Sequence, residues 1–186
     1  MKATIITSHL TAAAICTVMI GLIYAGIQQN YRMTANDPQT QIADDVSAYL
    51  MKGKSVDRFF KDDTIELSES LYPFVALYDK DGNVIRSTAV LNNTLPQMPK
   101  GVFSFAAING ENRVTWQPGP GVRMATVIKH ISSPYATYVV AGRSLNEIEI
   151  RESNLIKMSV IGWVLCMALL IIHFIWMMFR ARRIAV

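Results

Sequence analysis

Two long runs of apolar residues lie near the two ends of the chain. The first covers residues 3–27 and the second covers residues 158–179, and neither contains Asp, Glu, Lys or Arg. A helix of about 20 apolar residues crosses a hydrocarbon core about 30 Å thick. A core helix of a soluble protein would carry a polar stripe, which both runs lack. The pattern therefore predicts two transmembrane helices, at residues 1–29 and 158–179.

The first run could also be a cleaved signal peptide, because Lys2 precedes it and the small residues Ala25 and Gly26 lie near its end. The apolar part of a signal peptide is usually only about 7–15 residues long. This run is longer, and we therefore interpret it as a retained membrane anchor.

Basic residues set the expected orientation. Arg180, Arg182 and Arg183 directly follow the second run, and Lys and Arg are enriched on the cytoplasmic side of membrane spans. Two spans then place Lys2 on the same side. We expect a multi-pass protein of the cytoplasmic (inner) membrane, with both ends cytoplasmic, including the short basic tail 180–186, and the central domain periplasmic or extracellular.

The net charge of +4 follows from this arrangement. Residues 28–157 contain equal numbers of basic and acidic side chains, so the excess positive charge lies outside them. A nucleic-acid-binding protein would gather its basic residues on the folded part, and we therefore expect no nucleic-acid partner. The two cysteines, Cys16 and Cys166, lie inside the apolar runs, where they either pack as small apolar groups or contact each other.

The central residues 30–157 begin with helical signals. Asn36-Asp37-Pro38 is typical of a helix start, and apolar residues then recur at helical spacing as far as Leu50. Gly53 ends this helix. We expect a short second helix at residues 55–60 and further helical turns in the acidic segment 62–72.

The clearest β signal follows. Residues 74–79 and 84–88 read as two strands joined by a turn with the pair Asp81-Gly82, which is a strong hairpin signal. Residues 89–100 read as a loop and residues 101–109 as a short helix.

Three more strands are predicted at residues 112–117, 122–131 and 135–142. Alternation along 122–131 places Val122, Met124, Thr126 and Ile128 on one face. The fold class is therefore α+β, with a mainly antiparallel five-stranded sheet, a long N-terminal helix and helices on one side of the sheet. A capping box from Ser144 to Glu147 opens an exit helix that runs into the second span.

Three stretches in this order carry a family resemblance: the helix 36–50, the hairpin FVALYDKDGNVIRST (74–88) and the closing segment YVVAGRSLNEIEIRE (138–152). Together they resemble the extracytoplasmic PAS-like or single Cache sensor domains of bacterial membrane receptors, including histidine kinases. The resemblance implies a sensor fold over residues 30–157. Receptors of this type carry a cytoplasmic signalling module after the second span, whereas only residues 180–186 follow it here. We therefore expect signalling through a partner membrane protein or a homodimer.

A sensor pocket of this class would lie against the sheet and combine aromatic and cationic side chains. The candidates are Tyr78, Arg113, Trp116, Arg123, Lys129 and Tyr135. The alternative is ordinary sheet composition, with the aromatic side chains in the core and the cationic ones in water.

Two further groups of residues are candidates for signal transmission and membrane packing. The exit helix would transmit a signal through Ser144, Glu147, Ile148 and Leu155. Small residues at four-residue spacing on the first span would pack against the second span or another copy; they are Ala13, Thr17, Gly21 and Ala25. His173 is an ionisable residue inside a span, where it either serves a function or hydrogen-bonds across helices.

Known catalytic and metal-binding patterns are absent from the sequence. Asp79, Asp81 and Asn83 lack the glycine and closing glutamate of a calcium loop. We therefore expect no enzymatic activity, cofactor or metal. Two functions remain open: a sensor-like protein that binds a small ligand or a partner, and a docking subunit of a membrane complex. A sensor should contain a closed pocket on the sheet, whereas a docking subunit should have a filled domain and an exposed apolar patch.

Overall fold

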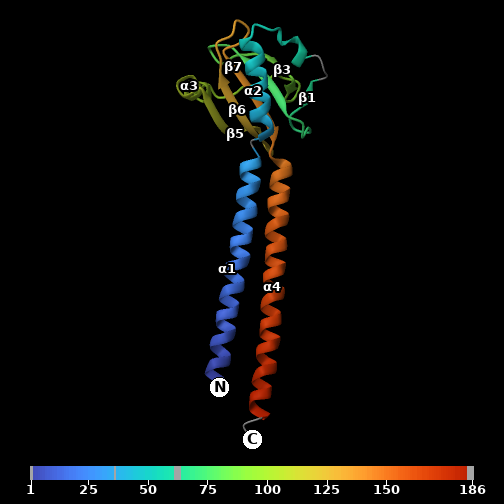
Figure 1. The fold of residues 1–186 in the computed structure, drawn as a ribbon. Helices are drawn as coiled ribbons and strands as arrows, with labels where there is room; N and C mark the ends of the chain where they lie inside the picture. The colour runs from blue at the N-terminus through green and yellow to red at the C-terminus, as the bar shows by residue number, and fades with distance from the viewer. Residues whose placement is uncertain (1, 36, 61–63, 184–186) are drawn as a thin grey trace. The chain divides into compact units, whose positions relative to one another are not determined.

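The structure is a computed structural model that describes residues 2–35, 37–60 and 64–183 (Figure 1). The chain forms two compact units. One comprises Met1–Tyr31 with Ile150–Val186, and the other comprises Arg32–Glu149.

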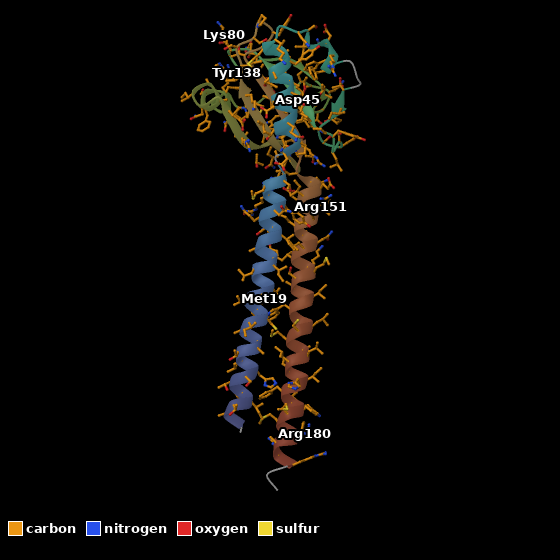
Figure 2. All side chains as sticks on the ribbon, viewed as in Figure 1. Met19, Asp45, Lys80, Tyr138, Arg151 and Arg180 are labelled. Carbon is orange, nitrogen blue, oxygen red and sulfur yellow. The ribbon has the colours of Figure 1, made fainter. Side chains whose placement is uncertain are left out.

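The first unit is a pair of long helices. Helix α1 covers Lys2–Thr34 and helix α4 covers Asn146–Arg183, and each contains an apolar window long enough to cross a membrane. Inside this unit the two helices lie side by side and run in opposite directions (Figure 1). Side chains project outward along both helices, as Met19 and Arg180 illustrate (Figure 2). The two predicted long apolar helices are therefore present.

The second unit is built on a five-stranded sheet whose strands are ordered β3-β2-β7-β6-β5. All four pairings are antiparallel, as the alternating sequence pattern predicted. The α+β fold with a five-stranded antiparallel sheet is thus confirmed. The strands are β2 (Phe74–Tyr78), β3 (Val84–Ser87), β5 (Glu111–Gly119), β6 (Val122–His130) and β7 (Tyr138–Ser144).

Helix α2 (Asp37–Met51) covers one face of this sheet. Its Ala43, Val46 and Leu50 side chains are buried together with alternate residues of the central strands. The strand residues of this layer are Val75, Leu77, Val127, Val139 and Ala141. The predicted helix start at Asp37-Pro38 is confirmed, and Asn36 lies outside the described residues.

The opposite face is covered by helix α3 (Lys100–Asn109), whose Phe103 and Ala106 are buried against the sheet. Our expectation of helices on one side only is therefore wrong. Strand β2 is buried at all five positions, and β6 is buried from Met124 to Ile128, including the residues between the predicted core positions. Such continuous apolar strands need cover on both faces.

The segment predicted as acidic helical turns is instead partly extended. Residues 61–63 lie outside the described part of the chain, but β1 (Ile65–Glu66) pairs in parallel with β4 (Ala89–Val90). The Ile65 and Leu67 amides donate hydrogen bonds to the Thr88 and Val90 carbonyls, at 3.0 and 2.9 Å. This pairing joins segments distant in sequence, so local helix propensity did not reveal it. It also adds a short strand to the predicted loop 89–100.

Most other local predictions hold. The hairpin has the expected turn, with Gly82 at a φ of 77°. The short helix after Ser55 is the 3₁₀ segment η1 (Val56–Phe59), and the predicted helix at 101–109 is α3. The last strand begins at Tyr138 and not at Tyr135.

Gly142 of β7 packs closely against side chains of both neighbouring strands. A Cβ atom built there would lie 2.8 Å from Cγ2 of Thr126 and closer still to the Phe74 ring. Because β7 is paired along both edges, it has little room to shift. The glycine therefore allows the Phe74 ring to pack across the centre of the sheet.

We predict that Gly142→Ala destabilises the domain by about 1–3 kcal/mol, the usual cost of overpacking a core. Urea unfolding of the full chain in detergent, followed by tryptophan fluorescence, measures this. Gly101→Ala is the matched control, because nothing lies within 4 Å of that position in α3. Equal stability of the two variants would contradict the packing argument.

Candidate functional site

The two aromatic strand residues among the pocket candidates are core residues. Tyr78 is fully buried, and its hydroxyl donates a 2.7 Å hydrogen bond to the Pro96 carbonyl. Burial raises the pKa of the Tyr78 hydroxyl, so the group is neutral at physiological pH. Trp116 is 6% exposed and packs against Phe74, with ring centroids 6.3 Å apart. Both fill the layer beneath α3.

The three cationic candidates lie on the other face of the sheet. Arg113 is paired in register with Val127, and Arg123 and Lys129 alternate with the core positions of β6. Each is ion-paired: Arg113 with Glu111 at 2.5 Å, Arg123 with Glu149, and Lys129 with both Asp44 and Glu111. These side chains are thus engaged within the domain.

Tyr135 lies before β7, is 40% exposed, and donates a 3.3 Å hydrogen bond to the Gly53 carbonyl. The six candidates are therefore distributed over both faces of the sheet and one loop. The structure does not bring them to one cavity, and ligand binding by them stays a prediction.

A surface hollow occurs elsewhere in the same unit. It is lined by Pro38, Leu71, Tyr72, Pro73 and Arg143. The Arg143 guanidinium at this hollow donates a 2.9 Å hydrogen bond to the Glu147 carboxylate. Sequence reasoning missed this site, although the exposed apolar pair Leu71-Tyr72 before a proline was a visible signal.

Lys129 links α2 to the sheet through ion pairs. Its ammonium group contacts the Asp44 carboxylate on α2 and lies 3.1 Å from a Glu111 oxygen on β5. Burial by itself would lower the pKa of Lys129, but the hydrogen bonds to Asp44 and Glu111 outweigh it and raise the pKa. Burial likewise opposes ionisation of Glu111, yet the hydrogen bonds from Arg113 and Lys129 lower its pKa.

The start of α4 is fastened to the sheet by several contacts. The Ser144 hydroxyl accepts a 3.3 Å hydrogen bond from the Asn146 amide, and the Leu145 amide donates to the Arg123 carbonyl at 2.8 Å. Arg143 and Arg123 hold Glu147 and Glu149 in the first turn of the helix. Two of the candidate transmission residues, Ser144 and Glu147, therefore lie at this junction, while Ile148 and Leu155 are half-buried along the helix.

The small-residue ridge of α1 faces α4 over much of its length. Thr17 accepts a 3.0 Å hydrogen bond from the Trp163 indole and donates one to the Ala13 carbonyl at 2.8 Å. Ala13 and Gly21 line grooves shared with α4, whereas Ala25 is exposed. The sequence left open whether this ridge packs against the second span or against another copy. The structure contains the contact with the second helix, α4.

His173 is in contact with a residue that sequence reasoning did not select. His9 Nε2 on α1 lies 3.0 Å from His173 Nδ1 on α4, and the two rings are stacked with centroids 5.1 Å apart. The two residues are 164 positions apart, so only the antiparallel pairing of the helices brings them together.

No protein-family model matches the chain, and a comparison with curated proteins gives no significant match. Function must therefore be argued from the sites themselves.

We predict that Lys129→Met destabilises the domain by about 1–2 kcal/mol at neutral pH, because it removes charge-assisted hydrogen bonds between α2 and the sheet. Glu111 has a lowered pKa, so its contribution is present above its unfolded value near 4.5 and is lost as pH falls through the folded value. The stability difference from wild type should therefore shrink below about pH 4.5. Unfolding curves at pH 7 and pH 3.5 test this.

Lys80→Met is the matched control, since Lys80 lies exposed in the turn of the β2–β3 hairpin. The ion-pair argument fails if both variants have equal stability at pH 7, or if the Lys129 effect is the same at both pH values.

Proposed function

We propose that the chain is a two-span membrane protein whose central domain docks a partner protein on the non-cytoplasmic side. One observation is the main support for the docking proposal. Both faces of the sheet are filled by the chain's own side chains, while apolar residues remain exposed on the outer side of α3. This combination is the one expected of a docking subunit.

The membrane assignment is supported by the length and composition of α1 and α4. Large apolar side chains are exposed all along both helices, including Leu22, Leu165 and Phe179. Exposure on this scale would be unfavourable in water and is favourable in lipid. The basic residues Arg180, Arg182 and Arg183 in the last turn of α4 support a cytoplasmic location of that end.

The exposed surface of α3 supports partner binding. Phe103 and Ala106 point into the core, whereas Phe105 and Ile108, three positions apart on the helix, are 53% and 84% exposed. We expect the partner to be a protein of the same membrane that presents an apolar surface. Confinement to one membrane raises the effective concentration of the two surfaces, so even a small apolar contact can then give stable binding.

The start of α4 supports a route by which docking reaches the membrane. β7 runs into α4 with only Leu145 between them, and α4 continues without interruption to Arg183. Arg123 and Arg143 fasten the first turn of α4 to the sheet. A partner that shifts the sheet would therefore act on the same helix that we assign to the second span.

Sensing of a small ligand is the second candidate function. The hollow beside Arg143 favours it, because Tyr72 and Leu71 offer apolar contact next to a guanidinium. The PAS-like and Cache-like resemblance of the sequence points the same way, and the five-stranded antiparallel sheet behind a long helix is compatible with that fold class.

We predict that a cysteine at Lys80 is labelled by a membrane-impermeant maleimide in intact cells, whereas one at Arg182 is labelled only after permeabilisation. Both are introduced singly into a chain in which Cys16 and Cys166 are replaced by Ser. The basic end of α4 should be cytoplasmic and the central domain outside. Reversed labelling, or labelling of both sites in intact cells, would contradict the two-span assignment.

We also predict that a photoreactive amino acid at Ile108 or Phe105 crosslinks to one discrete membrane protein in native membranes. The control position is Ile85 on edge strand β3, which is an exposed apolar residue on another part of the domain. An adduct of twice the chain's mass identifies a second copy as the partner. The docking proposal is wrong if α3 gives no adduct, or if Ile85 gives the same one.

A further inference from the structure

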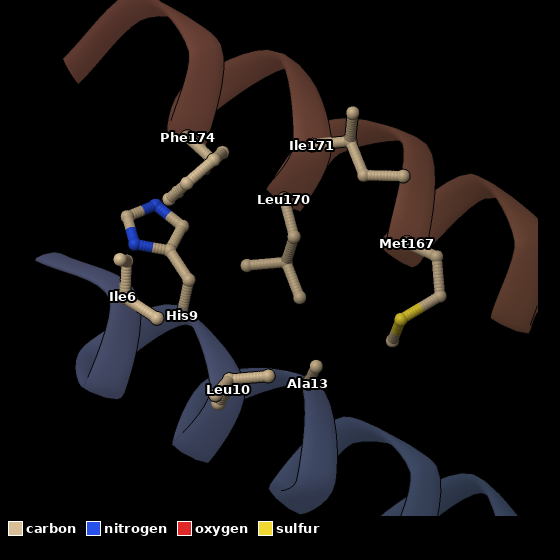
Figure 3. Close-up of a pocket in the computed structure, with 8 residues that line it drawn as sticks. All are labelled: Ile6, His9, Leu10, Ala13, Met167, Leu170, Ile171 and Phe174. Carbon is tan, nitrogen blue, oxygen red and sulfur yellow. The ribbon is translucent and has the colours of Figure 1, made fainter. Parts of the chain in front are cut away.

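The contact between His9 and His173 joins two ionisable side chains within apolar runs that contain no Asp, Glu, Lys or Arg. The neighbouring groove is lined by Ile6, Leu10, Ala13, Met167, Leu170, Ile171 and Phe174 around His9 (Figure 3). Ionisable side chains are costly inside a membrane and mark functional sites there. The pair therefore requires an explanation beyond helix packing.

The hydrogen bond to the Ile5 carbonyl determines which nitrogen of the neutral His9 ring carries the proton. Its Nδ1 atom lies 2.7 Å from the Ile5 carbonyl oxygen, which only accepts hydrogen bonds, so Nδ1 carries the proton. In the neutral ring Nε2 then presents a lone pair, and this atom faces His173 Nδ1. Metal-binding histidines are commonly held in this way, with the second ring N–H donated to a backbone carbonyl.

The distance between the two facing nitrogens is close to that of two ligands on one ion. Metal–nitrogen bonds of about 2.0–2.1 Å at a tetrahedral angle separate the ligand nitrogens by about 3.3 Å. His9 Nε2 and His173 Nδ1 are 3.0 Å apart. An ion bound by both nitrogens would lie beside the line that joins them, so both rings must turn until their lone pairs point at the ion.

We propose that His9 and His173 together bind a divalent first-row transition-metal cation such as Zn²⁺ or Cu²⁺, which imidazole ligands suit. On binding, the proton on His173 Nδ1 moves to Nε2 of the same ring, and the freed lone pair coordinates the ion. The neutral pair releases no net proton. Within the described residues no third His, Cys, Asp or Glu joins the two rings, so water completes the coordination.

The pair lies about two helical turns from a basic residue on each helix. His9 follows Lys2 by seven residues and His173 precedes Arg180 by seven, which corresponds to about 10 Å along each helix. Basic residues mark the ends of spans, and the pair lies nearer to the end of the helix pair that carries Lys2 and Arg180 than to the other end, so ions would reach it from that end. This proposal is independent of what the central domain docks.

The test uses the full chain in nanodiscs, purified through an N-terminal affinity tag without histidine. Zn²⁺ binding is measured by titration calorimetry, and Cu²⁺ coordination by pulsed electron paramagnetic resonance, which detects imidazole nitrogen. We expect one ion per chain, a spectrum of two imidazoles, and an affinity at least tenfold weaker in His9→Gln and in His173→Gln. Circular dichroism verifies that both variants keep their helices.

His130 is the third histidine of the chain and lies on β6, so His130→Gln is the matched control and should bind as wild type does. The Cys16→Ser/Cys166→Ser chain should also bind normally. The proposal is overturned by a wild-type chain that binds no ion, by a spectrum without imidazole, or by undiminished binding in the double histidine variant. If a glutamine variant fails to fold, the wild-type spectrum still shows whether imidazole nitrogens coordinate the ion.

Discussion

Strand β7 is paired along both of its edges, with β2 on one side and β6 on the other, and the rest of the domain depends on these pairings. Its residues Tyr138–Gly142 are buried on both faces, so their backbone groups must find partners within the sheet. Strands β2 and β6 supply these hydrogen-bond partners. Strand β3 then pairs with β2, and β5 pairs with β6, so that β3 and β5 form the two edges of the sheet. The faces are then closed by α2 and α3. Gly142 is the point at which this arrangement leaves no room for a side chain.

The sequence predicted those parts of the fold whose partners are close along the chain. Asp81-Gly82 marked the β2–β3 hairpin, and Pro118 to Gly121 separated two alternating runs that became β5 and β6. It did not predict the parallel β1–β4 pair, because Ile65 and Ala89 are distant in sequence and each strand has only two residues. The continuous apolar run of β2 indicated cover on two faces, which we had not inferred.

The candidate pocket residues show a second limit of prediction from sequence. Residue type alone cannot tell a pocket aromatic from a core aromatic, and Tyr78 and Trp116 belong to the core. Likewise Arg113, Arg123 and Lys129 could have faced a ligand, but each meets a carboxylate of the same domain. His9 was overlooked because its significance depends on His173, which only the antiparallel arrangement of α1 and α4 brings next to it.

Two polar contacts between described residues of α1 and α4 help to give a mostly apolar helix pair a defined register. Under the proposed membrane assignment the helices face lipid, which is as apolar as leucine, so apolar packing alone discriminates weakly between registers. The His9–His173 contact and the Trp163–Thr17 hydrogen bond lie eight residues apart on α1 and ten apart on α4. Sliding or rotating one helix would break both bonds at once. Two such contacts at different positions along the helices therefore define one alignment of the pair.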